Sequence, residues 1–227
     1  MAKRMETRGI CAFCGQEVAK RSVAPHLQKC QKYQESLQAA EASGRPPETI
    51  WHIRVQDAYA KYYWLNLEMK GSATMNSLDR YLRAIWLECC DHLSEFTIGG
   101  WGGRKIGKGR KADLVFQPGV VLRHLYDFGT TSETDIIVVG SRQGVPLTQH
   151  PITLLMRNKQ PEMLCQVCGE PAVWLCHRCI YEDDLTGCLC DEHAQDHPHE
   201  DYGELYRVVN SPRMGLCGYE GPAEPPY

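Results

Sequence analysis

Apolar residues alternate with polar ones, or run together, in six short stretches between residues 50 and 158. Such stretches are rich in aromatic and β-branched residues and are typical of strands. We therefore expect strands at IWHIRV (50–55), YYWLNLEM (62–69), SEFTIGG (94–100), VVLRHLYDF (120–128), ETDIIVVG (133–140) and PITLLMRN (151–158).

One stretch repeats its apolar residues at helical spacing instead. The repeat follows i, i+4, i+7, i+8 and i+11, which predicts one apolar face of a helix about 16 residues long. Asn76 or Ser77 can cap the start of this helix. The residues of the face are Leu78, Leu82, Ile85, Trp86 and Cys89. A helix laid on an antiparallel sheet predicts an α+β fold with a two-layer core.

Two Gly/Pro-rich junctions divide the chain. SGRPPET (43–49) follows a polar helical segment, and NKQPE (158–162) follows the last predicted strand. Gly and Pro at such positions favour turns and linkers. We therefore expect three parts, namely residues 1–42, 50–158 and 161–227, with small zinc-stabilised modules flanking the central core.

The third part holds the densest cluster of metal-ligand residue types. In residues 165–199, ten of the thirty-five residues are Cys or His. Two residues between ligands let a pair bind one tetrahedral ion, and four such pairs or near-pairs occur here. Few apolar residues lie between them, so bound metal would supply the folding free energy, on the order of 10 kcal/mol per structural site.

We expect these ligands to pair in an interleaved order. One site would contain Cys165, Cys168, Cys190 and His193, and the other Cys176, Cys179, His197 and His199. This order resembles cross-brace fingers such as the B-box, which are interaction modules. With four protein ligands, both sites would be closed and structural.

Three further residues leave alternatives open. Cys188 could take the place of Cys190, and Cys217 could also replace a ligand. His177 lies between two ligands, and we expect it to point outward.

The first part contains a smaller set of ligands, namely Cys11, Cys14, His26 and Cys30. The last two lie one helical turn apart and face the same side. The pattern resembles a CCHC finger of the ββα type, which raises the expected total to about three zinc ions. Its helix carries Arg21, Lys29 and Lys32, which could hold phosphates. The alternative is a folded cap or a protein-contact module.

A glycine-rich basic loop, GGWGGRKIGKGRK, interrupts the central part. Its glycines let backbone amides approach an anion, and Trp101 could stack on a base. The alternative is a solvated hairpin loop. The candidate nucleic-acid-binding residues are Trp101, Arg104, Lys105, Lys108, Arg110 and Lys111.

Charge and cysteine content limit the possible partners and the cellular compartment. Residues 161–227 carry three Lys/Arg against thirteen Asp/Glu, whereas residues 1–35 carry seven against three, so the two ends would attract different partners. No apolar run is long enough to span a bilayer, and the N-terminal residues lack the apolar segment of a secretory signal. Twelve cysteines in such a chain favour metal binding in a reducing cytoplasm. The sequence does not determine an oligomeric state.

The central part also resembles a known family. YWLNLEMKGSATMNSLDRYLRAIWLECCDHLSEFTIGG (63–100), HLYDFGTTSETDIIVVG (124–140) and NSPRMGLCGYEG (210–221) are similar to a family named after the third open reading frame of an Ri plasmid. Some members are labelled passenger proteins of insertion elements. The resemblance implies an α+β domain and a mobile-element or defence context, but no defined activity.

Three functional hypotheses follow. The first is a non-enzymatic, nucleic-acid-associated accessory factor that uses the finger and the basic loop. The second is a protein-interaction adaptor that uses the acidic cross-brace. The third and weakest is a hydrolase that uses an open zinc site or a thiol–imidazole pair. Its candidate residues are Cys89, Cys90, His92 and His124.

Overall fold

The computed structural model describes residues 7–198 and 205–227. The strands are β1 Arg8–Cys11, β2 Glu17–Ala19, β3 Glu48–Asp57, β4 Trp64–Lys70, β5 Ser94–Ile98, β6 Arg104–Ile106, β7 Val121–Tyr126, β8 Ser132–Gly144, β9 Ile152–Asn158, β10 Trp174–Leu175, β11 Cys188–Leu189 and β12 Tyr206–Arg207. The α-helices are α1 Val23–Lys29, α2 Gln31–Ala42, α3 Met75–Leu82, α4 His177–Tyr181 and α5 Asp191–Gln195. Shorter helical segments are η1 Lys20–Ser22, η2 Arg83–Leu87, η3 Ala112–Leu114 and η5 Leu216–Gly218.

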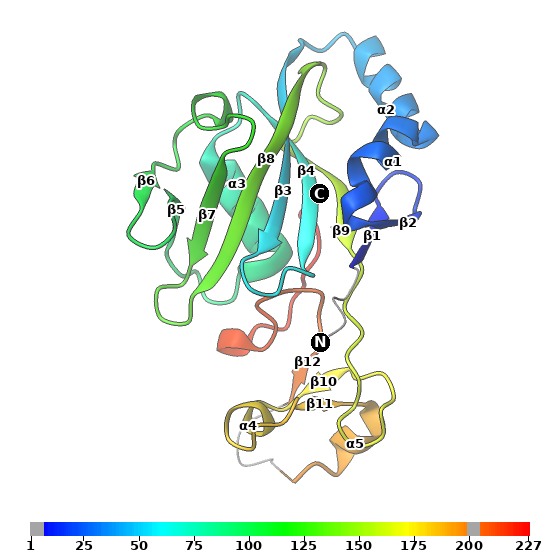
Figure 1. The fold of residues 1–227 in the computed structure, drawn as a ribbon, viewed down its shortest axis with the longest axis vertical. Helices are drawn as coiled ribbons and strands as arrows, with labels where there is room; N and C mark the ends of the chain where they lie inside the picture. The colour runs from blue at the N-terminus through cyan, green and yellow to red at the C-terminus, as the bar shows by residue number, and fades with distance from the viewer. Residues whose placement is uncertain (1–6, 199–204) are drawn as a thin grey trace.

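A nine-stranded sheet forms the main body, in the order β2-β1-β9-β4-β3-β8-β7-β5-β6. All its neighbouring strands are antiparallel. Helix α3 and its continuation η2 lie behind the sheet in the view of Figure 1. The α+β class expected from the sequence is therefore confirmed.

The core lies between this helix and the sheet. Leu78, Leu82, Ile85 and Trp86 are fully buried, as their helical spacing requires. They pack in one cluster with Ile53 and Val55 from β3 and with Leu65 and Leu67 from β4. Burying each such side chain contributes about 1.5–3 kcal/mol. This core fixes the sheet on which the candidate sites are built.

The ends of the central helix differ from the sequence expectation. The helix begins at Met75, with Thr74 rather than Asn76 or Ser77 in the cap position. Its first amides find backbone partners instead, because Met75 and Asn76 donate to the carbonyls of Arg110 and Lys108. The helix ends at Leu87 with a π-helical turn, so it is shorter than expected and Cys89 lies beyond it.

The finger is part of the large sheet. Strand β1 pairs with β9 through Gly9↔Asn158, Ile10↔Arg157 and Cys11↔Met156. The finger therefore shares backbone hydrogen bonds with the central part, although the sequence placed a linker between them.

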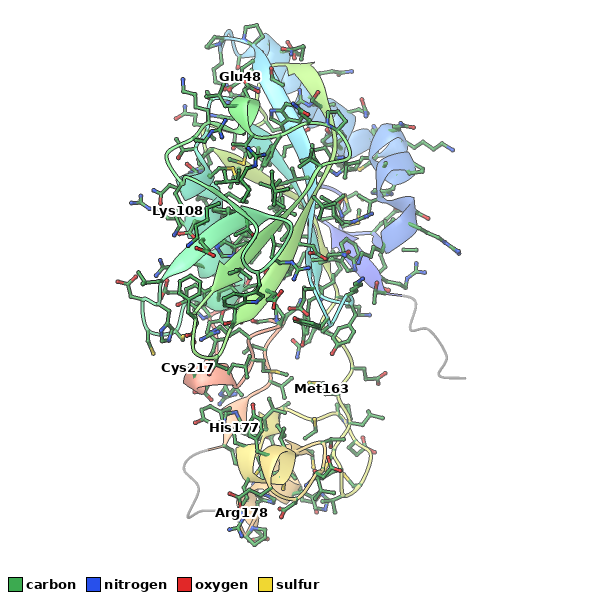
Figure 2. All side chains as sticks on the ribbon, turned by 60° about the vertical axis from the view of Figure 1, so that its left-hand side comes forward. Glu48, Lys108, Met163, His177, Arg178 and Cys217 are labelled. Carbon is green, nitrogen blue, oxygen red and sulfur yellow. The ribbon has the colours of Figure 1, made fainter. Side chains whose placement is uncertain are left out.

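A small body lies below the large sheet in Figure 1. It contains the three-stranded sheet β11-β10-β12 and helices α4 and α5. We call residues 163–209 the small module; Met163 and His177 are labelled in it in Figure 2. Residues 210–227, the returning tail, leave it and pack on the main body. Ser211 donates to the carbonyl of Trp86 (2.6 Å), and Tyr227 stacks on His150.

Candidate metal centres

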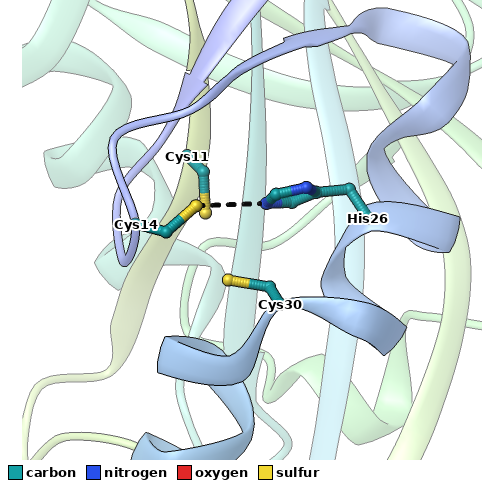
Figure 3. A group of neighbouring side chains, drawn as sticks. All are labelled: Cys11, Cys14, His26 and Cys30. Atoms are coloured by element: carbon teal, nitrogen blue, oxygen red, sulfur yellow. Dashed lines mark hydrogen bonds between the residues drawn. The ribbon is translucent and has the colours of Figure 1, made fainter.

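The finger ligands converge from four different local structures (Figure 3). Cys11 ends β1, Cys14 follows in the turn, His26 lies on α1 and Cys30 separates α1 from α2. Their four ligand atoms all lie within 4.8 Å of one another, and Cys14 Sγ is 3.5 Å from His26 Nε2. The turn after Cys14 needs the left-handed backbone of Gly15 (φ 72°), a conformation that glycine adopts at little cost.

These separations can be compared with a zinc tetrahedron. With Zn–S near 2.3 Å and Zn–N near 2.1 Å, adjacent ligand atoms lie about 3.8 Å apart for two sulfurs and about 3.6 Å for sulfur and nitrogen. The Cys14–His26 distance fits such an edge. The finger side chains therefore gather four ligand atoms close enough together to hold a zinc ion.

The small module gathers a second group of four. Cys165 and Cys168 form one knuckle, and Cys190 and His193 come from the start of α5. Cys168 Sγ lies 3.8 Å from Cys190 Sγ, and the four ligand atoms lie within 4.8 Å of one another. Although burial raises the pKa of Cys165, the backbone amides of Cys168 and Cys190 lower it to about 6. The knuckle thus favours the thiolate, which is the form that binds metal.

A third group lies in the same small module. Cys176 and Cys179 flank the start of α4, and His197 follows α5. Cys179 Sγ lies 3.5 Å from His197 Nε2. The expected fourth ligand, His199, lies outside the described residues. The two groups interleave along the chain, as in a cross-brace.

Two residues near these groups have other partners. Cys188 is buried, its Sγ lies 3.6 Å from the carbonyl of Thr186, and no described ligand group includes it. His177 stacks on Tyr206 with 4.2 Å between ring centroids. It therefore packs toward β12 and the returning tail, whereas the sequence suggested an outward direction.

A fourth group was missed as a set by the sequence analysis. Cys89, Cys90 and His92 follow η2, and Cys217 from the returning tail joins them. Sequence separation hid this group, because Cys217 lies more than a hundred residues further along the chain. His124 is not a member. It is fully buried and its Nε2 lies 2.8 Å from Asp79 Oδ1. The described residues thus include four Cys/His groups that could hold a metal ion.

The basic loop is tied to acidic neighbours. Lys108 Nζ donates to Asp79 Oδ2 (2.9 Å) and Ser94 Oγ (2.6 Å). Lys105 pairs with Glu95, and Trp101 donates to Glu133. Burial raises the pKa of Asp79, but hydrogen bonds from His124, Ser94 and Lys108 hold it well below its usual range. Lys108 therefore stabilises a buried carboxylate.

The remaining basic residues of the loop, Arg104, Arg110 and Lys111, are exposed. Strand β6, which carries Arg104, is the last strand of the sheet on one side, whereas the finger strands β2 and β1 form the opposite side. With strands spaced about 4.8 Å apart, the two lie tens of ångströms from each other. The finger and the loop do not form one continuous basic surface.

Comparisons with known proteins add little. No protein-family model matches the chain, and no curated protein matches it. A solved structure of a protein of unknown function from Methanosarcina mazei Go1 is similar at 16% identity and a TM-score of 0.40, covering 47% of this chain and 68% of that one. This similarity supports no inference. Among the described residues, no helix is both long enough and apolar enough to cross a bilayer.

Proposed function

We propose that this chain is a zinc-stabilised, non-enzymatic adaptor whose small module binds a protein partner. The Cys/His groups could hold the ions that stabilise it. Cys₃His and Cys₂His₂ sets form closed structural sites when all four ligands bind.

The observation that carries this proposal is an exposed apolar and acidic surface on the small module. Val167 is 62% exposed, Tyr181 66% and Leu185 52%. Gln166 accepts a hydrogen bond from Gly187 (2.8 Å), so the knuckle with Val167 lies beside the loop with Leu185. We call Val167, Tyr181, Leu185 and the exposed acidic residues Glu182, Asp183 and Asp184 the knuckle patch.

The composition of this patch indicates the chemistry of the partner. Exposed apolar residues rimmed by charge are typical of protein interaction sites. The surplus of acidic residues in this part of the chain repels nucleic acid and attracts a basic segment. We therefore infer a partner segment that combines Lys or Arg with apolar anchors.

Quantitative affinity purification with the full chain tests this proposal. The double variant Val167→Ser/Leu185→Ser should lose a partner that the wild type retains. Val139→Ser, which removes an exposed apolar side chain of β8, is the matched control. The purified partner should then bind the double variant at least tenfold more weakly, and added salt should weaken wild-type binding. A set of captured proteins that is the same for all three chains would contradict the proposal.

A second candidate function rests on the loop at the β6 edge. Arg104, Arg110 and Lys111 are exposed in the same loop as Trp101, which is 53% exposed. Phosphate contacts by the cations and stacking by the indole would suit single-stranded nucleic acid. The resemblance to the Ri-plasmid family would place such binding in a mobile-element or defence context.

A salt series distinguishes this second candidate. If two phosphates of a single strand contact Arg104 and Lys111, Arg104→Glu/Lys111→Glu should reduce the slope of log affinity against log salt by about 1.4. Lys159→Glu changes an exposed cation after β9, six strands away from β6, and should leave the slope unchanged. Absence of binding at low salt would exclude this function.

A further inference from the structure

We propose that Cys89, Cys90, His92 and Cys217 bind a structural zinc ion that fastens the returning tail to the main body. Three of these ligands come from the loop that follows η2, and the fourth comes from η5 in the tail. Figure 2 shows Cys217 where the tail meets the main body, above the small module. This inference does not depend on the proposed partner.

The distances in this group match those of a zinc site. Cys90 Sγ lies 3.8 Å from Cys217 Sγ, and His92 Nε2 lies 3.4 Å from Cys217 Sγ. The edges of a tetrahedral zinc site are about 3.8 and 3.6 Å. A disulfide needs a sulfur–sulfur distance of about 2.05 Å, so the two thiols are placed as co-ligands rather than as a bonded pair. Three thiolates and one imidazole are soft donors that suit zinc.

The loop is held in the shape that the site needs. Arg83 forms ion pairs with Glu88 and Asp91, and the Asp91 amide donates to Glu88 Oε1 (2.7 Å). Asp91 itself has a left-handed backbone (φ 56°), as does Cys217 (φ 52°). Such a conformation costs of order 1 kcal/mol or more outside glycine and persists where the surroundings require it. Asp91 lies between the ligands Cys90 and His92, and Cys217 is itself a ligand. Both strained residues therefore help the ligand atoms to converge.

A buried arginine supports the site from the tail side. Arg213 is fully buried and donates to Cys89 Sγ (3.3 Å) and to Asp127 Oδ2 (2.7 Å). Zinc binding releases three thiol protons and leaves a Cys₃His site with one net negative charge. A guanidinium donating to one of the sulfurs stabilises that charge. Hydrogen bonds from neighbouring residues commonly orient metal ligands in this way.

The use of cysteine in the chain points the same way. Of its twelve cysteines, eleven belong to the four Cys/His groups, and only Cys188 belongs to none. The group at Cys217 accounts for three of the four cysteines that the other groups leave over, the fourth being Cys188. A full set of four protein ligands makes it a closed, structural site rather than a catalytic one.

Alkylation of the native wild-type protein tests the site without any substitution. Cys90 and Cys217 are exposed, so free thiols there should react readily with iodoacetamide. If they bind zinc, mass spectrometry should show at least tenfold slower labelling before a chelator is added than after. Equal rates with and without the chelator would overturn the proposal. So would a Cys90–Cys217 disulfide, seen as a peptide pair that is labelled only after reduction.

Metal analysis of variants supplies the second readout. Cys217→Ser should bind one zinc ion fewer per chain than the wild type, and protease should cleave its tail sooner. Cys188→Ser, the matched control, should keep the wild-type zinc content. Because the result is a difference between chains, it does not depend on the occupancy of the other three groups. An unchanged zinc content in Cys217→Ser would overturn the proposal, and if that variant does not fold, the native alkylation decides.

Discussion

His124 is fully buried on β7, where its Nε2 lies 2.8 Å from Asp79 and its Nδ1 has no hydrogen-bond partner among the described residues. Burial lowers the pKa of His124 below its usual value of 6.5, and this effect outweighs the hydrogen bond with Asp79, which raises it. Protonation would place a second buried N–H at Nδ1 without an acceptor, so the neutral ring suits the site. The role of His124 is therefore structural.

This burial predicts a pH dependence of stability. Below about pH 6.5 the unfolded chain takes up a proton at His124 that the folded chain does not, so the free energy of unfolding falls with acid. His124→Gln removes this contribution. Between pH 6.5 and 5, the free energy of unfolding of this variant, measured with urea, should fall less steeply with acid than that of the wild type. The difference in slope should be up to about 1.4 kcal/mol per pH unit. Loss of zinc in acid affects both chains, so the difference between them isolates His124; parallel profiles would contradict the assignment.

At the scale of elements, the junction between β1 and β9 joins the finger to the sheet. A Cβ on Gly9 would lie 2.4 Å from the Trp64 ring and 2.5 Å from the carbonyl oxygen of Arg157. Gly9→Ala should therefore push β1 away from β9 and destabilise the protein by about 1–3 kcal/mol, measured by thermal unfolding. Gly140→Ala on β8 has open space around the new methyl and serves as control. Equal stability of the two variants would show that β1 does not need this close approach.

At the scale of the whole molecule, the two ends depend on metal to different degrees. In the small module, one of the two buried clusters consists of Cys165, Cys176, Cys179 and Leu189, so candidate ligands make up most of that cluster. The finger instead packs Val23, Leu27 and Tyr33 against Trp64 and Leu155 of the large sheet. Apolar burial against a stable sheet stabilises the finger independently of an ion.

Removal of zinc with a chelator should destabilise the small module more than the finger. Hydrogen exchange measured by mass spectrometry should show that amides of β10 and β11 lose protection when zinc is removed. Amides of β1 that pair with β9 should keep more of theirs, because the main-body core remains. Retained protection throughout the small module after complete zinc removal would contradict a metal-stabilised module.

The sequence by itself determined six of the seven strands of the central part and the candidate ligand pairs of the two metal-rich ends; it missed β6, which lies in the segment predicted as a basic loop. Hydrophobic spacing indicated the six strands and the face of α3, because burial on one side imposes its period on the chain. Ligand pairs with two or three residues between them could also be recognised, because a short turn or one helical turn brings their side chains together.

Only the tertiary structure decided how distant segments meet. It joined the finger to the sheet through β1 and β9. It placed Thr74 in the cap position of α3, where the carbonyls of Arg110 and Lys108 accept from the first amides. It also placed basic residues against Asp79 and Glu95. It also brought Cys217 to Cys89, Cys90 and His92. These contacts depend on the path of the folded chain in space, and no local periodicity or spacing encodes that path.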